Sequence, residues 1–328
     1  MRTSLPFLAA ILLFAPLLPL RAGDTSTPPD TSAASIPADS TPAPGNLKTS
    51  YEFDAETSYV GSARTHFGDD GTGNVSEQTD SSRLLIEPQF NDGPIYRFGL
   101  AYERYNFGLS KAAPIPNILQ AENVVVGMDF ELFNSWLVRV EADPGLYGDA
   151  RDTGFRTFNA PFSIGGSYIA SETVQYIAGL EVDFNRQIPV IPAVGIHWSL
   201  NDNWVLDAVL PTPRIEYDYD KNLTLFLGGD FDDGTYRLDR VFAGDYGVAK
   251  PSTVAEGKHT GPNLNNAIVE YDEVRVGVGF SWKATKAITF ELEAGYLPYR
   301  EFDFHRADVH FSNDDGAAYG RMSFNAQF

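Results

Sequence analysis

The 328-residue chain contains no cysteine. Disulfide bonds are therefore excluded, and so are zinc sites and nucleophiles that need a thiolate. The same absence excludes the lipid-modified cysteine that would anchor a bacterial lipoprotein. Covalent cross-links thus contribute nothing to the stability of this chain.

Long apolar runs are also missing, except at the start of the chain. There, Arg2 precedes the stretch LPFLAAILLFAPLLPL, and Ala22 stands at a plausible cleavage position. This arrangement predicts a secretory signal peptide over residues 1–22 that is removed from the mature protein. A retained membrane anchor is the alternative, but the run is short and prolines interrupt it. Residues 23–47, rich in Pro, Ser and Thr, predict a disordered leader, followed by one domain over residues 48–328.

Basic residues are few: the chain has 24 Lys and Arg against 44 Asp and Glu. Loss of residues 1–22 removes two arginines and no acids, so 22 − 44 leaves a formal charge of −22. Such a chain repels nucleic acid, which we exclude as a partner. Aromatic residues at 13%, with 29 glycines and 21 prolines, predict many short strands joined by turns.

Period-two alternation dominates the chain after the leader. In ITFELEAGY, residues 288–296, every second residue is apolar, and Glu291 and Glu293 fall on the other face. EVRVGVGFSW, residues 273–282, alternates in the same way. Two folds fit this pattern. A soluble β-sandwich buries the apolar face in a core, whereas a transmembrane barrel turns it to lipid and the polar face to a wet lumen.

Three features favour the barrel. Charged residues and glycines share the minority face along many consecutive strands, and a sheet that crosses lipid must close on itself. The tryptophans stand at strand ends, where amphipathic rings favour the membrane interface: Trp136, Trp198, Trp204 and Trp282. Tight turns alternate with longer connections, as short periplasmic turns and longer outer loops do in outer-membrane barrels.

We therefore predict an all-β fold, a closed antiparallel transmembrane β-barrel of about 14 strands in the bacterial outer membrane. Pro211 and Pro213 leave 12 strands as the alternative, because they could mark a bulge in one long strand instead of a tight loop. The predicted strands cover residues 50–66, 80–90, 95–109, 119–133, 136–149, 158–170, 174–186, 190–200, 204–210, 214–219, 223–230, 266–283, 286–304 and 316–328.

The chain closes on GRMSFNAQF, which alternates up to an aromatic last residue. This resembles the C-terminal signature of bacterial outer-membrane barrels. The resemblance implies that the barrel-assembly machinery reads Met322, Phe324 and Phe328, which makes that machinery and outer-membrane lipid the expected partners. Residues 211–239 further resemble a stretch of an outer-membrane barrel family of unknown function, which implies a fold but no catalytic residues. The oligomeric state stays open.

Candidate chemistry is sparse. His197 and Ser199 resemble the His-x-Ser pair of outer-membrane lipid hydrolases, but they lie beside a tight turn of the predicted periplasmic rim, whereas those enzymes act at the outer leaflet. We interpret the pair as lumen lining and predict no enzyme. The acidic stretches 69–73 and 230–235, and the histidines at 305 and 310, lack metal-ligand spacing, so we predict no metal site and no cofactor.

Charged residues opposite the lipid-facing stripe must meet water or one another, because isolated charges in lipid are costly. This argument predicts that a set of side chains faces the lumen: Arg97, Glu103, Asp129, Glu131, Arg139, Glu181, Asp183, Glu273, Arg275, Glu291, Glu293 and Arg321.

The leading hypothesis is a porin-like channel for passive diffusion of small polar solutes or ions, with a mild cation preference from the acidic excess. A closed barrel with a structural or adhesive role is one alternative, and a lipid-processing hydrolase is another. The span 230–265 could fold inward and narrow the pore, or lie outside as a surface loop.

Overall fold

The computed structural model describes residues 47–67, 71–91, 93–110, 113–132, 135–151, 154–242 and 264–328. The predicted signal peptide and nearly all of the predicted leader lie outside the described residues, as does the middle of the 230–265 span. The described residues include two short 3-10 turns, η2 (Phe155–Thr157) and η4 (His305–Ala307). In the described part of the chain, no helix is long and apolar enough to cross a membrane.

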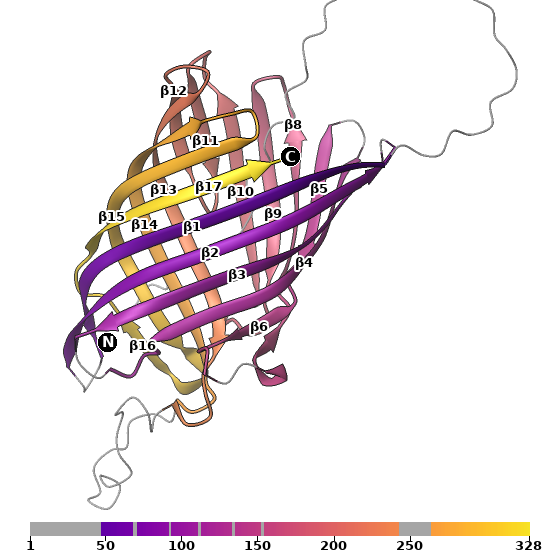
Figure 1. The fold of residues 1–328 in the computed structure, drawn as a ribbon. Coiled ribbons are helices and arrows are strands. Elements are labelled where there is room, and N and C mark those ends of the chain that lie inside the picture. The colour runs from indigo at the N-terminus through magenta and orange to yellow at the C-terminus, as the bar shows by residue number, and fades with distance from the viewer. Residues whose placement is uncertain are drawn as a thin grey trace, which may run out of the picture.

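Fourteen of the 17 strands in the described residues form a closed antiparallel ring (Figure 1). β1 pairs with β2 on one side and with β17 on the other, so the sheet has no free edge. The ring strands are β1 (Leu47–His66), β2 (Thr72–Phe90), β3 (Ile95–Leu109), β4 (Ile118–Leu132), β5 (Trp136–Ala142), β8 (Phe162–Ile169), β9 (Val174–Val182), β10 (Val190–Ser199), β11 (Trp204–Val209), β12 (Arg214–Asp218), β13 (Leu223–Arg237), β14 (Ile268–Lys283), β15 (Ile288–Phe304) and β17 (Ala317–Gln327). The short strands β6 (Gly145–Gly148), β7 (Phe158–Asn159) and β16 (Val309–Ser312) are not members of the ring: β6 pairs with β4, β7 with β6 and β16 with β15.

The prediction of 14 strands is confirmed, and the 12-strand alternative is wrong. Trp204 of β11 pairs with Tyr217 of β12, and residues 210–213 join the two strands as a hairpin. Two predicted boundaries on the loop side are also wrong. β2 begins at Thr72 instead of residue 80, and β13 continues to Arg237 instead of ending at residue 230. Polar side chains in these strand ends are the reason that the sequence indicated loops.

The outward face of the ring is apolar, as lipid requires. Aromatic pairs mark the end with the short turns, which also carries the C-terminus (Figure 1). They join Trp136 to Tyr168, Trp204 to Tyr217 and Trp282 to Phe290, with ring centroids 5.1, 5.0 and 6.0 Å apart. This belt is typical of a membrane interface, so we assign this end to the periplasmic side.

The ring is tall on one side and low on the other. β1 to β4 and β13 to β15 have 15 to 20 residues each, whereas β5 and β8 to β12 have 5 to 10. A tilted strand crosses a bilayer in about 9–11 residues. The tall strands therefore extend beyond the outer surface of the membrane.

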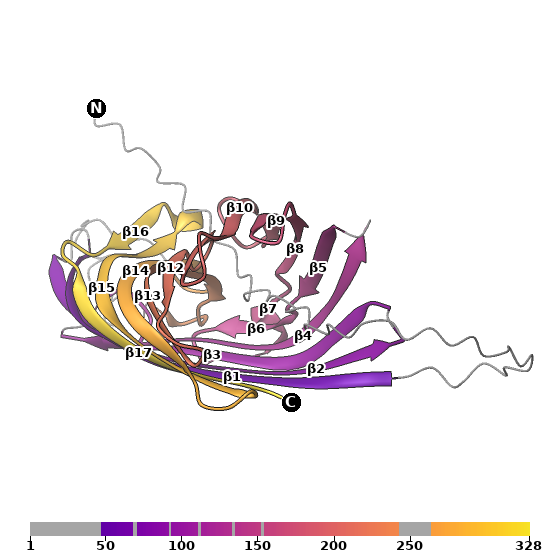
Figure 2. The same ribbon diagram turned by 90° about the horizontal axis from the view of Figure 1, so that it is seen from above.

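Prolines interrupt the wall where it becomes low. Pro144 follows β5 and Pro161 precedes β8, and the N–H of Asp143 donates to the carbonyl of Pro161 (2.9 Å). Beyond these prolines, β6 and β7 lie inside the ring (Figure 2). β6 pairs with β4 along one edge, and its Gly148 pairs with Arg237 of β13. β6 thus joins the two ends of the tall wall and closes a smaller ring.

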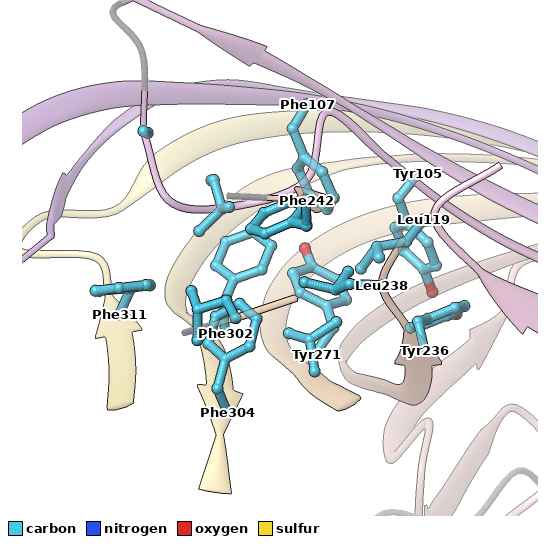
Figure 3. Close-up of a cluster of buried hydrophobic side chains, with 14 of the residues drawn as sticks. Tyr105, Phe107, Leu119, Tyr236, Leu238, Phe242, Tyr271, Phe302, Phe304 and Phe311 are labelled. Atoms are coloured by element: carbon cyan, nitrogen blue, oxygen red, sulfur yellow. The ribbon is translucent and has the colours of Figure 1, made fainter. Parts of the chain in front are cut away.

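We call the outer ends of β1 to β4 and of β13 to β15, with β6 and β16, the outer section, and the rest of the ring the membrane section. Inside the outer section lies a hydrophobic core of rings and aliphatic side chains (Figure 3). Its members are Phe67, Val75, Tyr105, Phe107, Ala113, Ile115, Leu119, Ala121, Tyr236, Leu238, Phe242, Leu264, Val269, Tyr271, Phe302, Phe304 and Phe311.

The flanks of the 230–265 span contribute to this core. Leu238, Phe242 and Leu264 are fully buried in it. The described flanks therefore fold inward, and they help to close the axis of the barrel at the outer end. The middle of the span lies outside the described residues.

Candidate functional site

The interior of the membrane section is lined by paired charges. On the wall of β2 to β5, Arg97 is buried and contacts Glu87 at 2.7 Å and Glu141 at 3.1 Å. Arg139 donates two hydrogen bonds to Asp129, at 2.7 and 2.6 Å. These side chains alternate along their strands with lipid-facing residues, which is why they meet one another inside the ring.

A second network lies on the wall of β12 to β17. Arg214 forms a two-pronged pair with Glu291, with both N–O distances at 2.9 Å. Arg321 bonds to Glu293 and to Asp230. Paired guanidinium and carboxylate groups leave this interior polar without leaving an isolated charge buried.

Small residues make room for these long side chains. A Cβ on Gly277 would lie 2.5 Å from Oε1 of Glu293, and one on Gly228 would lie 2.7 Å from Cγ of Arg214. The glycines on the inward face of the strands therefore leave the space that the charged side chains occupy. Any larger residue at Gly228 or Gly277 would displace them.

The most deeply buried network lies where the two sections meet. Glu77 contacts Arg275 and Arg300, each at 3.0 Å. Arg275 also pairs with Glu273, which accepts a hydrogen bond from the hydroxyl of Tyr271 at 2.9 Å. The charges of this layer thus separate the polar interior of the membrane section from the aromatic core of the outer section.

The other candidates from the sequence are placed less uniformly. Glu103 accepts hydrogen bonds from Tyr105 and Tyr236 at the edge of the outer core, at 2.9 and 3.1 Å. Glu181 and Asp183 lie apart from the networks above, near the low side of the ring. Glu131 is exposed at the periplasmic end of β4.

Several interior residues were missed by sequence reasoning. Glu77 lies in a strand end that was read as a loop, and Asp230 is the last residue of the predicted strand 223–230. Arg300 follows a register shift between β14 and β15, which moves it to the inner face. Arg83 and Glu87 could have been found, because they occupy the face of β2 opposite Leu84 and Ile86.

The C-terminal strand places its assembly candidates on the lipid side. Met322 and Phe328 are exposed, and the ring of Phe324 lies between those of Phe53 (6.1 Å) and Phe290 (5.2 Å). Assembly machinery that binds this strand would contact these side chains on one face. Their role in assembly stays a prediction.

His197 and Ser199, which we interpret as lumen lining, lie in β10, and the ring of His197 is 3.8 Å from a carboxylate oxygen of Asp207 on β11. Residues 230–235 belong to β13, and part of the stretch 69–73 lies outside the described residues. Within the described ranges, no group of three or more His, Asp or Glu could hold a metal ion.

Comparison with known proteins gives weak structural matches. An outer membrane channel from Pseudomonas putida F1 aligns with a TM-score of 0.43 at 11% identity, over 90% of this chain and 100% of that chain. The Pseudomonas putida toluene transporter TodX aligns with 0.43 at 9% identity, over 85% and 90%. A Pseudomonas aeruginosa FadL homologue aligns with 0.37 at 8% identity, over 86% and 89%.

Scores this low carry no argument about what the chain does. No known family matches the chain, and no curated protein matches it. The resemblance of residues 211–239 to a barrel family of unknown function therefore stays a prediction. The closed ring with its apolar exterior makes the chain a bacterial outer-membrane β-barrel.

Proposed function

We propose that the protein is an outer-membrane channel for small polar solutes or ions. The observation that carries the proposal is the polar lining of the membrane section. Charged side chains face inward on both walls, and neighbouring glycines leave room for them. Such a lining accepts water and hydrated ions, whereas a barrel that served only as a structural element could fill this space with apolar side chains. The acidic excess of the chain predicts a preference for cations.

The outer section restricts this channel. Its hydrophobic core of 17 buried residues fills the space that the tall strands enclose. Each large apolar side chain stabilises a core by about 1.5–3 kcal/mol, so opening the axis would cost on the order of tens of kcal/mol. Passage therefore needs a route beside the outer section, on the low side of the ring.

Single-channel conductance in planar bilayers tests the proposal. We expect stepwise conductance from the refolded protein, with KCl gradients giving a reversal potential on the cation side. Glu131→Gln at the periplasmic mouth should lower the cation preference, because it removes an exposed charge from the solute path. Glu122→Gln, on the same strand but on the outer surface of the outer section, is the matched control.

Silence from a protein with the heat-modifiable mobility of a folded barrel would overturn the channel proposal. The closed structural barrel would then be favoured, since the hydrophobic core already closes the axis. The hydrolase alternative would need lipid hydrolysis that disappears in both His197→Ala and Ser199→Ala.

A further inference from the structure

A second buried polar cluster lies on the low side of the ring. Arg186 ion-pairs with Asp233 and lies 3.3 Å from Glu181. Beside it, Thr235 donates to Asp183 at 2.6 Å, and the amide of Asn159 donates to the same carboxylate at 3.0 Å. All of these side chains except that of Asn159 are at least nine-tenths buried.

This cluster lies on the opposite face of β13 from the hydrophobic core. Tyr236 points into the core of the outer section, and Asp232 accepts a hydrogen bond from Tyr105 of that core. Asp233 and Thr235 alternate with these residues and therefore face the other way, towards β7 and β9. The cluster thus occupies the space beside the outer section, where a polar route must run.

The wall of the ring is incomplete at this height. β11 pairs with β10 only from Gly195 to Ser199, and β12 pairs with β13 only up to Gly228. Between the hairpin turn 210–213 and the outer end of the barrel, no strand in the described residues lies between β10 and β13. The segment 183–189, which we call the strap, reaches over this gap, and the N–H of Gln187 donates to Glu270 of β14 (3.1 Å).

We propose that the strap is a gate of the channel, and that Arg186 holds it closed by occupying a site for cationic solutes formed by Glu181 and Asp233. The inference rests on the proposed channel function and adds the route, the gate and the class of solute. The guanidinium group of Arg186 indicates which solutes the site would bind. A solute guanidinium or ammonium group can replace it at the same carboxylates.

The contacts of the strap suit a part that opens. They are hydrogen bonds and ion pairs, which water or a solute can replace, whereas the hydrophobic core has no such substitute. The strap buries little apolar surface, because Phe184 is 72% exposed and Ile188 is 47% exposed. Release of Arg186 would take this partner away from the carboxylates of Glu181 and Asp233 along the gap, and so would admit cations in preference to anions.

Arg186 stays charged in the closed state. Burial alone would lower its pKa, but Asp233 and Glu181 raise the pKa above the ordinary value for arginine. The guanidinium group therefore keeps its charge over the range of pH in which cells live, and competition by another cation is a way to release the strap.

The test is conductance of Arg186→Ala and Asp233→Asn in KCl. Arg186→Ala should raise the open probability by at least roughly tenfold, because its charge-assisted contacts with both Asp233 and Glu181 are lost. It should also increase the cation preference. Asp233→Asn should open the gate too, but with a smaller gain in cation preference, because one carboxylate has been neutralised. Arg306→Ala, an exposed arginine of η4, removes the same charge elsewhere and should behave like wild type.

Guanidinium is the chemical probe. Millimolar guanidinium chloride should raise the open probability of wild type and have no such effect on Arg186→Ala, with tetramethylammonium chloride as the control cation that cannot donate hydrogen bonds. Conducting wild type with Arg186→Ala indistinguishable from Arg306→Ala would overturn the gate and leave the channel proposal standing. If every folded variant is silent, the channel proposal fails, and the gate fails with it.

Discussion

The two sections of this barrel place their apolar side chains on opposite faces of the same strands. In β3, Phe98 and Leu100 face lipid while Arg97 faces the interior. A few residues further along the same strand, Tyr105 and Phe107 fill the interior core. In both sections apolar side chains avoid water, but lipid surrounds the membrane section and water surrounds the outer section. The solvent outside the wall, and not the barrel fold itself, decides which face is polar.

The junction between the sections should be the most sensitive position. Glu77→Ala removes the carboxylate shared by Arg275 and Arg300, and leaves two buried guanidinium groups without it. We expect a loss of about 5 kcal/mol in the free energy of unfolding, at the upper end for breaking a buried ion pair. Urea unfolding in lipid vesicles measures it.

Glu122→Ala on the outer surface provides the control for this change and should lose little stability. Equal losses in the two variants would contradict the view that the charged layer supports both sections.

The outer core should behave like the core of a soluble protein. Phe302→Ala removes a fully buried ring that packs against Phe107 and Tyr271, with centroids 5.0 Å away in both cases. We expect a loss of about 4 kcal/mol in the free energy of unfolding, because the deletion leaves a cavity. The lipid-facing change Phe98→Ala should cost less than half as much, since lipid fills the space. The same unfolding experiment compares them, and equal costs would mean that the outer core is loosely packed.

At outward-facing positions, a new charge should destabilise the membrane section more than the outer section. On β4, Val126→Arg places a charge in lipid and should destabilise the barrel by about 3 kcal/mol. Gln120→Arg points outward from the outer section, where the amide now donates to Glu122 (2.5 Å), and should change stability by less than about 0.5 kcal/mol. If Gln120→Arg proved as harmful as Val126→Arg, the outer section would lie within the membrane.

The sequence predicts the membrane section well, because lipid allows no polar residue at an outward position. β14 and β17 could therefore be read from alternation alone. The charged candidates of these strands follow for the same reason, since Arg275 or Arg321 cannot face lipid. What the pattern cannot show is the partner of each charge, because that depends on which strands are neighbours across the ring.

The outer section escapes the same reading. At residues 230–237 the outward face meets water and buried polar groups, so the alternation loses its apolar set and resembles a loop. Arg186 lies in a connection between strands, where no periodicity marks it. Its role depends on contacts with Asp233, which is 47 residues away in the chain. Sequence reasoning could therefore give inward folding of the 230–265 span only as one of two alternatives.

The register shifts in the wall have a consequence for how this protein can change in evolution. The pairing of β1 with β2 shifts between Val60 and Ala63, and that of β14 with β15 between Val274 and Val276, both close to the junction of the sections. A single-residue insertion or deletion within a straight strand exchanges its two faces. At a bulge, the extra residue is absorbed locally. Length changes should therefore be tolerated in a narrow band around the barrel, which would let the outer section be exchanged or enlarged while the membrane section keeps its register.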